Sequence, residues 1–523
     1  MRLRKNMKRA AAAALALSVA LSAAAPAALA KDYYIDDGDI TVTVTEDGDT
    51  FVRVGKAVNK DDIGVKDDTE VVIKGGEKQT ENNSDGSADE AAGQKPVVDA
   101  EPGEPAEETG TELVVWPENV NSGEAQKKDD PEPAEEEQKT PDTQKPEGKT
   151  DAATLEASTE QKPVEKAAED DDDDHDIMTY EDNTADTVTN AVNEAVKHVI
   201  KIINNCTKKD TTVTIKDVNI DVSGKGRSAM FVQGKGDTTL KLEGNNTLKS
   251  GQSCAGLEKD DDFSTGKLTI TAEDTNSSLS AYGGHGGAGI GGGNQKSTSK
   301  LEIANGKIDA VGGVLGAGIG GGGFGGNGEV SISGGEVTAQ GGDSAAGIGG
   351  SASGSGKVTI KNGEVTAKTN GAAAAIGGGN RGSGDVTILD GRVTTTLVNN
   401  NPVTGIGGGI GSTNKSTVRI LGGVVDAVGG GYGSGIGGGK GGVEVEIGGG
   451  AQVTAKGGKG GAYDGDTYGA GAAIGTNGDK DGKAGKEQDV NAIGEGTVTR
   501  IDSQLPDDSE HKHEWTFVSS TLV

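Results

Sequence analysis

Short hydrophobic strands recur along the C-terminal two-thirds of the chain. One signature has a polar residue between two hydrophobic ones, and it recurs every 27 to 33 residues, beginning at Val213, Leu240, Leu268, Leu301, Val330, Val358, Val386, Val418 and Val445. Side chains alternate between the two faces of a strand, so the first and third residues of each signature are expected to point inward. A period in this range is typical of repeat architectures.

Two further elements recur in the same order within each repeat. A second strand, such as GEVTA, follows an Asn-Gly or Gly-Gly turn, and a glycine-flanked isoleucine comes third, at Ile290, Ile319, Ile348, Ile376, Ile406, Ile436 and Ile474. Three short strands per repeat predict a triangular coil in which Val330, Ile332, Val337 and Ile348 form one inward layer. The sequence therefore predicts an all-β fold, a parallel β-helix (solenoid) of about nine rungs over residues 205–505.

The pattern changes on the N-terminal side of the repeats. Residues 31–75 alternate as short strands and are expected to be a small β segment, the N-terminal part of the solenoid. Residues 76–186 are rich in Pro, Glu, Asp and Lys, with almost nothing to bury, which predicts a disordered acidic insertion. Residues 187–204 place Val192, Val196 and Val199 on one helical face and predict an amphipathic capping helix. A strand over HVIKII is the competing interpretation.

The two ends of the chain carry signals of their own. Residues 1–30 have a basic start, an alanine-rich apolar stretch and small residues ahead of Lys31. This pattern predicts a signal peptide, and hence a secreted protein, in solution or attached to the cell surface. Residues 506–523 are expected to be a C-terminal tail, whose SEHKHEWTF resembles the start of small Cys-containing modules.

The net charge of −32 is concentrated in one N-terminal part of the chain. Residues 31–190 contain 47 Asp+Glu and 15 Lys+Arg, a net of −32, and residues 1–30 contribute +5. The remaining 35 acids and 30 bases leave residues 191–523 at −5. Nucleic acid is disfavoured as a partner, because phosphate binding needs concentrated Lys and Arg.

Catalytic and nucleotide motifs find little support. The repeated AGIGGG resembles a dinucleotide fingerprint, but seven copies without a following helix indicate a corner of the coil. Only one histidine, His285, lies inside the repeats, and the carboxylates there are spread singly along the strands. We therefore expect a protein that is not an enzyme, with a lyase-like activity as the minor alternative.

The positions of the aromatic residues suggest where a sugar could bind. Aromatics make up only 3 % of the chain, yet five stand beside glycine-rich stretches where a ring could stack on a sugar face: Tyr282, Phe324, Tyr432, Tyr463 and Tyr468. Rings that fold back onto the coil are the alternative.

Metal and disulfide sites are less defined. Asn477, Asp479 and Asp481 follow the first half of a calcium-loop pattern, with Gln488 where a bidentate Glu should stand, so a polar loop is the alternative to calcium. Cys206 and Cys254 could pair in an oxidising exterior or remain two thiols.

Residues 211–290, with TTVTIKDVNIDV and the first GAGIGGG, resemble bacterial β-helical carbohydrate-binding domains of Gram-positive gut and cellulolytic bacteria. The resemblance covers about residues 211–500 and, more weakly, residues 33–74. It implies a right-handed parallel β-helix that binds plant polysaccharides, including acidic, pectin-like chains, with calcium. We therefore expect a non-catalytic protein that binds extended polysaccharide on a rigid solenoid. The alternative is a structural adhesin or stalk that contacts protein or a host surface.

Overall fold

A computed structural model describes residues 30–67, 69–76, 196–398, 401–501 and 512–517, the last range by its backbone alone. The described residues belong to one compact unit. All but the last residue of the expected signal peptide, all but the first residue of the acidic insertion and the first part of the predicted helix fall outside these ranges. No helix in the described ranges is long and apolar enough to cross a membrane.

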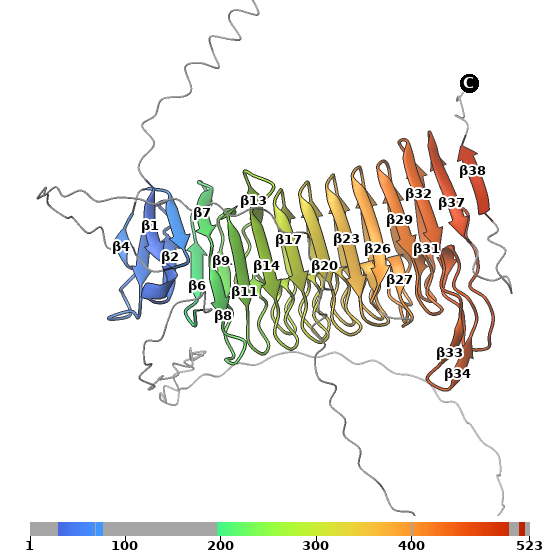
Figure 1. The fold of residues 1–523 in the computed structure, drawn as a ribbon, viewed down its shortest axis with the longest axis horizontal. Coiled ribbons are helices and arrows are strands. Elements are labelled where there is room, and N and C mark those ends of the chain that lie inside the picture. Colours follow the sequence, from blue (N-terminus) through green and yellow to red (C-terminus); the bar gives the residue numbers. More distant parts are fainter. Residues whose placement is uncertain (1–29, 68, 77–195, 399–400, 502–511, 518–523) are drawn as a thin grey trace, which may run out of the picture. The chain divides into compact units, whose positions relative to one another are not determined.

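The unit is a parallel β-solenoid, as the repeat pattern predicts (Figure 1). The nine signatures lie in consecutive strands of the first of its three sheets, which has 12 strands within the described residues. The strands of this first sheet are β1 (Lys31–Tyr34), β5 (Val71–Lys74), β7 (Thr211–Lys216), β10 (Thr238–Glu243), β13 (Leu268–Ala272), β16 (Thr298–Ile303), β19 (Gly328–Ile332), β22 (Gly356–Ile360), β25 (Gly384–Ile388), β28 (Ser416–Ile420), β31 (Val443–Gly448) and β36 (Asn491–Ile493).

The second sheet is built from the strand that follows the Asn-Gly or Gly-Gly turn. Its last strand, β38, is antiparallel to β37. The strands of the second sheet are β8 (Asn219–Asp221), β11 (Asn245–Lys249), β14 (Ser278–Tyr282), β17 (Lys307–Val311), β20 (Glu336–Gln340), β23 (Glu364–Thr369), β26 (Arg392–Leu397), β29 (Val424–Val428), β32 (Ala451–Lys456), β37 (Gly496–Ile501) and β38 (Lys512–Phe517).

The third sheet contains the glycine-flanked isoleucines. Its first three strands pair antiparallel, β4 with β3 and β3 with β2. From β2 onward the strands pair in parallel, beginning with β2 and β6. The strands of the third sheet are β4 (Val65–Lys66), β3 (Thr50–Val54), β2 (Ile40–Val44), β6 (Ile200–Asn204), β9 (Met230–Gly234), β12 (Leu257–Glu258), β15 (Ile290–Gly291), β18 (Ile319–Gly320), β21 (Ile348–Gly349), β24 (Ala374–Gly377), β27 (Thr404–Gly407), β30 (Ile436–Gly438) and β35 (Ile474–Thr476).

Two small elements lie outside these sheets. A 3-10 turn, η1 (Ile35–Asp37), follows β1. A hairpin of β33 (Gly461–Tyr463) and β34 (Asp466–Tyr468) extends from one of the last coils (Figure 1).

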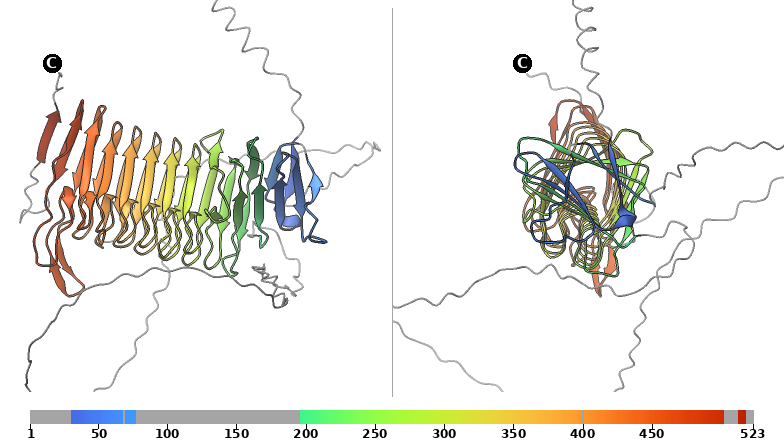
Figure 2. Two further views of the ribbon diagram at one scale, coloured as in Figure 1. Left: turned by 180° about the vertical axis from the view of Figure 1, so that it is seen from behind. Right: turned by 90° about the vertical axis from the view of Figure 1, so that its left-hand side faces the viewer.

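The core is a stack of like residues. Val330, Ile332, Val337 and Ile348 are all at most 2 % exposed, which confirms the predicted inward layer. Ile348 pairs with Ile319 on one side and Ile376 on the other, so each coil repeats the contacts of its neighbour. The coils superpose when the solenoid is seen end-on in Figure 2. Repeated in-register pairing leaves the interior filled by short branched side chains.

The N-terminal segment joins this stack. β5 pairs with β7 in parallel, and β2 pairs with β6, so residues on both sides of the undescribed range 77–195 lie in adjacent coils. Residues 31–74 thus form the first coils of the solenoid.

The helix predicted over residues 187–204 is wrong in its described part, because Ile200–Asn204 is the strand β6. Ile200 and Ile202 are buried on the same face, which is the two-residue period of a strand. β6 fills the place between β2 and β9, so backbone pairing on both sides outweighs the helical periodicity. The competing strand interpretation holds for this stretch.

The two cysteines are free thiols and are not joined in a disulfide. Cys206 is buried just after the end of β6, and Cys254 lies ahead of β12.

Candidate binding groove

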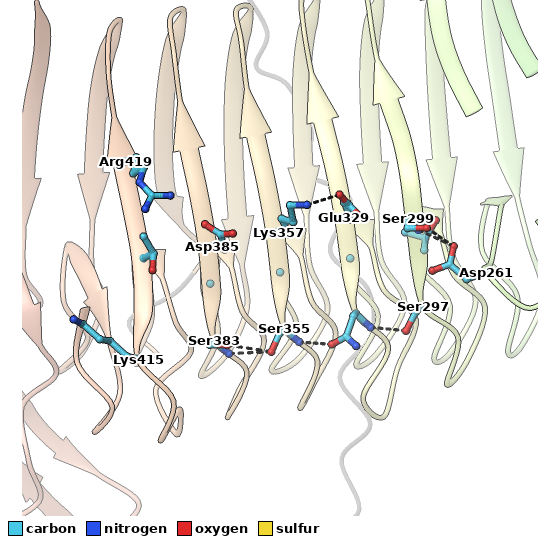
Figure 3. A pocket seen from close by; sticks show the side chains of 16 residues that line it. Asp261, Ser297, Ser299, Glu329, Ser355, Lys357, Ser383, Asp385, Lys415 and Arg419 are labelled. Atoms are coloured by element: carbon cyan, nitrogen blue, oxygen red, sulfur yellow. Dashed lines mark hydrogen bonds and ion pairs between the residues drawn. The ribbon is translucent and has the colours of Figure 1, made fainter. Parts of the chain in front are cut away.

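An open groove of about 760 Å³ crosses the outer face of the first sheet (Figure 3). It runs over β16, β19, β22, β25 and β28, at the end of each strand where the chain enters the sheet. Five strands at the usual spacing give it a length of about 20 Å. The groove is therefore parallel to the axis of the coil and perpendicular to the strands.

Two columns of outward residues line the groove. The first contains Asn327, Ser355, Ser383 and Lys415, and the second contains Glu329, Lys357, Asp385 and Thr417. The second column is directly paired from strand to strand, because Glu329, Lys357, Asp385 and Thr417 are register partners in turn. Each coil thus contributes one small polar group and, in most coils, one charged group.

A ladder of hydrogen bonds fixes the first column. The Asn327 amide donates to Ser297 Oγ at 3.0 Å, and the Ser355 amide donates to Asn327 Oδ1 at 2.8 Å. The Ser383 amide donates to Ser355 Oγ at 3.3 Å, and the two hydroxyls lie 3.2 Å apart. This wall of the groove is therefore preformed, with hydroxyl and amide groups at a regular spacing.

The charges in and beside the groove alternate in sign. Lys357 Nζ lies 2.7 Å from Glu329 Oε1, and Lys415 Nζ lies 2.9 Å from Glu444 Oε2. The hydrogen bond to Glu329 raises the pKa of Lys357, and nearby Asp385 adds to this. Asp261, at one end, accepts hydrogen bonds from the Ser299 amide and hydroxyl at 2.9 and 2.8 Å. Because opposite charges lie side by side, the surface suits a neutral, hydrogen-bonding ligand better than a strongly charged one.

Three of the five predicted aromatic residues come together, but against the coil. Tyr432 and Tyr468 are stacked with ring centroids 3.9 Å apart and an interplanar angle of 8°. Tyr463 meets Tyr432 edge-on at 5.9 Å and remains 40 % exposed. Tyr432 is only 9 % exposed, because the β33–β34 hairpin folds its rings over it. Tyr432 and Tyr468 therefore hold the hairpin in place, and Tyr463 is the most exposed of the three.

The other two aromatics stand apart. Tyr282 ends strand β14 and is partly buried, with Lys249 Nζ 5.6 Å from its ring centroid. Phe324 is 57 % exposed in a corner loop, where its φ is +58°. The structure does not bring these five residues into one site, and none of them lines the groove.

Two of the three proposed calcium residues, Asn477 and Asp479, accept hydrogen bonds from backbone amides. Asn477 Oδ1 accepts a hydrogen bond from the Ser434 amide at 2.8 Å. Asp479 Oδ1 accepts from the amides of Asp481 and Lys483, at 2.9 and 3.2 Å. Among the described residues no three His, Cys, Asp or Glu side chains converge as a metal site. The local hydrogen bonds favour the polar-loop interpretation of this segment.

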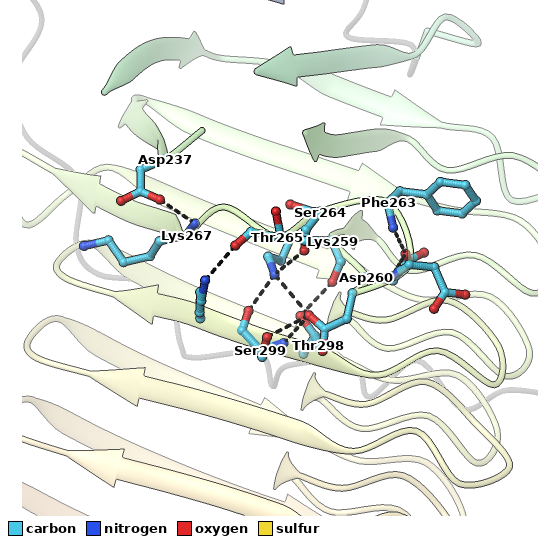
Figure 4. Close-up of polar contacts among 12 residues, drawn as sticks. Asp237, Lys259, Asp260, Phe263, Ser264, Thr265, Lys267, Thr298 and Ser299 are labelled. Atoms are coloured by element: carbon cyan, nitrogen blue, oxygen red, sulfur yellow. Dashed lines mark hydrogen bonds and ion pairs between the residues drawn. The ribbon is translucent and has the colours of Figure 1, made fainter. Parts of the chain in front are cut away.

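A buried lysine organises an irregular loop at one end of the groove (Figure 4). The side chain of Lys259 is fully buried, and its Nζ donates to the carbonyl oxygen of Ser299 at 2.6 Å and to that of Ser264 at 3.4 Å. Asp260 is 1 % exposed and accepts the amides of Asp262 and Phe263 at 3.2 and 3.1 Å. A buried charge is tolerated only when it is well hydrogen-bonded, so these contacts hold the loop over residues 260–265 in one conformation.

Glu258 occupies a position that later coils fill with glycine, as its pairing with Gly291 shows. Its Oε2 accepts hydrogen bonds from Ser228 Oγ at 2.6 Å and from the Ala255 amide at 2.9 Å. Burial raises the pKa of Glu258 to about 7. Burial and this carboxyl raise the pKa of the Cys254 thiol to about 11, so Cys254 is a poor nucleophile at neutral pH.

We expect Glu258 to make stability depend on pH. A carboxyl with a raised pKa binds its proton more tightly in the folded state, so its contribution is present below about pH 4.5 and is lost as the pH rises to about 7. Glu258→Gln should remove up to about 3 kcal/mol of this dependence. Urea unfolding of both proteins near pH 4.5 and near pH 8 measures it. Equal pH dependence in the two proteins would contradict the prediction.

The groove residues carry a signal that turn chemistry obscures in the sequence. Asn327-Gly328, Ser355-Gly356 and Ser383-Gly384 each precede a hydrophobic–polar–hydrophobic strand by one residue, as NGEVSI, SGKVTI and SGDVTI. The column is visible in the sequence as a repeated Asn/Ser-Gly dipeptide, but such dipeptides are also typical of turns.

No protein-family model, no curated protein and no solved structure matches the chain.

Proposed function

We propose that the protein binds an extended polysaccharide in the groove of the first sheet, without cleaving it, outside the cell. The groove is the observation that carries this proposal: it is an open channel across five coils, with a small polar side chain in each coil and a charged side chain in most of them. A glycan chain offers hydroxyls at a similarly regular spacing, and each can donate and accept hydrogen bonds. The export signal expected in residues 1–30 and the resemblance to carbohydrate-binding domains support the same function.

The groove supports binding better than cleavage. Glu329 is ion-paired to Lys357, and Asp261 is held by two hydrogen bonds from Ser299. General acid–base catalysis needs a carboxyl poised near the reacting bond with a pKa near the working pH. The carboxyl with a pKa of about 7, Glu258, does not line the groove. The alternating charges favour a neutral glycan, and an acidic, pectin-like glycan would need calcium to bridge it to the groove's carboxylates.

We expect the double variant Lys357→Ala/Asp385→Ala to bind glycan about tenfold more weakly, because it removes two charged hydrogen-bonding groups from the middle of the groove. Affinity electrophoresis of the mature protein through gels containing neutral glucan or pectin, each with and without EDTA, measures the effect. A matched control is Lys307→Ala/Glu336→Ala, which removes an exposed ion pair of 2.9 Å from the second sheet.

Three outcomes would overturn the proposal. Equal retardation of the two double variants would place binding elsewhere on the molecule. No retardation in any gel would favour a structural stalk. A rise in absorbance from unsaturated uronides would indicate a lyase.

A further inference from the structure

A row of side chains crosses the outer face of the third sheet at its N-terminal end. Pairing from strand to strand joins Arg53 to Thr41, Thr41 to Lys201, Lys201 to Phe231 and Phe231 to Glu258. The next coils carry Gly291 and Gly320 at the same position. Large outward side chains in this row are thus confined to the first coils, away from the groove of the first sheet.

Two cations in this row have no carboxylate partner within the described ranges. Arg53 donates to the carbonyl oxygen of Asp62 at 2.7 Å and to Thr41 Oγ1 at 3.2 Å, and its Nε is buried with no hydrogen-bond partner. Lys201 is partly buried, with Nζ 5.8 Å from the ring centroid of Phe231. Burial and the neighbouring Arg53 both lower the pKa of Lys201. Two adjacent cations with only neutral partners favour an anion between or beside them.

Aromatic rings adjoin the two cations. Phe231 meets Phe263 edge-on with centroids 5.8 Å apart, and Phe263 is 55 % exposed. Phe51 lies in the adjacent outward row, across Thr43 from Ile203. Three of the five phenylalanines of the chain therefore lie on this one face. Because aromatics are so few in this chain, their gathering beside unpaired cations indicates a binding surface.

The loop that carries the exposed ring of Phe263 is held by buried polar contacts. The Phe263 amide donates to Asp260, which is 1 % exposed, and the loop is fixed to the next coil by fully buried Lys259 (Figure 4). Lys296 Nζ lies 5.8 Å from the Phe263 ring centroid and is ion-paired to Asp262. These contacts fix the backbone of the loop that carries the exposed ring, which lowers the entropy cost of binding there.

We propose that this cation–aromatic face, formed by Arg53, Lys201, Phe231 and Phe263, binds an anionic sugar ring without a metal ion. The ammonium and guanidinium groups would hold the carboxylate or sulfate, and the rings would pack against the apolar C–H face of the sugar. Hexuronates and sulfated sugars share this chemistry. Arg53, Lys201 and Phe231 lie on strands of the third sheet, and Phe263 lies in the loop whose Asp261 lines one end of the groove. Binding at the two cations is therefore tested separately from binding in the groove.

The test measures the binding of three trisaccharides to the mature protein in EDTA, by ligand-observed NMR and calorimetry. One probe is a hexuronate, one a sulfated sugar and one a neutral sugar of the same linkage. We expect one or both anionic probes to bind at least about tenfold more tightly than the neutral one. Lys201→Gln should abolish this preference and Lys201→Arg should retain it, while Phe263→Ala should weaken binding about three- to tenfold.

One control variant distinguishes binding at this face from the loss of any surface lysine. Lys307→Gln removes an exposed lysine from the second sheet and should not change the preference for the anionic probes. Comparison of the hexuronate probe with the sulfated probe shows whether the face binds a carboxylate or a sulfate. Equal binding of anionic and neutral probes, no binding of any probe, or an unchanged preference in Lys201→Gln would overturn the proposal.

Discussion

Replacing Ile348 by aspartate is expected to unfold the coils on either side of it and to lower the free energy of unfolding by at least about 5 kcal/mol. Ile348 is 0 % exposed and is stacked between Ile319 and Ile376 in the third sheet. The substitution removes a buried aliphatic side chain and adds an unpaired carboxylate where no polar group can solvate it. Urea unfolding followed by circular dichroism measures the loss.

The matched control introduces the same charge on the outside of the solenoid. Thr359 lies at an outward position of β22, between the buried residues Val358 and Ile360. Thr359→Asp should change the free energy of unfolding by less than about 1 kcal/mol. If Ile348→Asp unfolds at the same urea concentration as Thr359→Asp, the isoleucine stack is not the core of the fold.

Replacing Gly349 by alanine is expected to lower the free energy of unfolding by more than about 3 kcal/mol. Gly349 has φ of +131°, and a Cβ added there would lie 2.0 Å from the carbonyl oxygen of Gly377 in the next coil. Both the backbone conformation and the close approach of the neighbouring coil therefore require glycine. The same two conditions hold at Gly320, so the glycine flank of the third sheet is required by packing.

A control at Gly450 distinguishes the cost of the backbone conformation from the cost of the contact between coils. Gly450 also has a positive φ, of +79°, but a Cβ there would meet nothing within 4 Å. Gly450→Ala should lower the free energy of unfolding by only about 1 kcal/mol, the cost of the backbone conformation alone. Similar losses in the two variants, measured by urea unfolding, would show that the contact between coils is unimportant.

The solenoid could be predicted because its determinants are local and repeated. In each signature, as in Val330 and Ile332, alternation alone assigns the inward face, and the fixed period aligns one coil with the next. Residues 200–204 lack this redundancy. Ile200 and Ile203 fit a helical period, whereas Ile200 and Ile202 fit a strand period, and the choice depends on pairing with the edges of β2 and β9.

The candidate sites were harder to predict than the fold. Glycine-rich loops have no alternation that separates inward from outward residues, so the burial of Tyr432 under Tyr468 has no signature in the sequence. The cation–aromatic face requires register between segments far apart in the chain, since Arg53 and Lys201 meet only because β2 stands between β3 and β6. The groove had a local signal in its Asn/Ser-Gly dipeptides, but turn chemistry explains the same residues.

The groove proposal is tested most directly by the dependence of affinity on glycan length. The measurement is calorimetric titration of the mature protein with a series of neutral oligosaccharides of one linkage, from two sugar units upward, in EDTA. A groove with similar polar groups over five coils predicts affinity that rises with each added sugar and levels off when the chain spans about 20 Å. Affinity that does not change with length, or the absence of binding at every length, would contradict it.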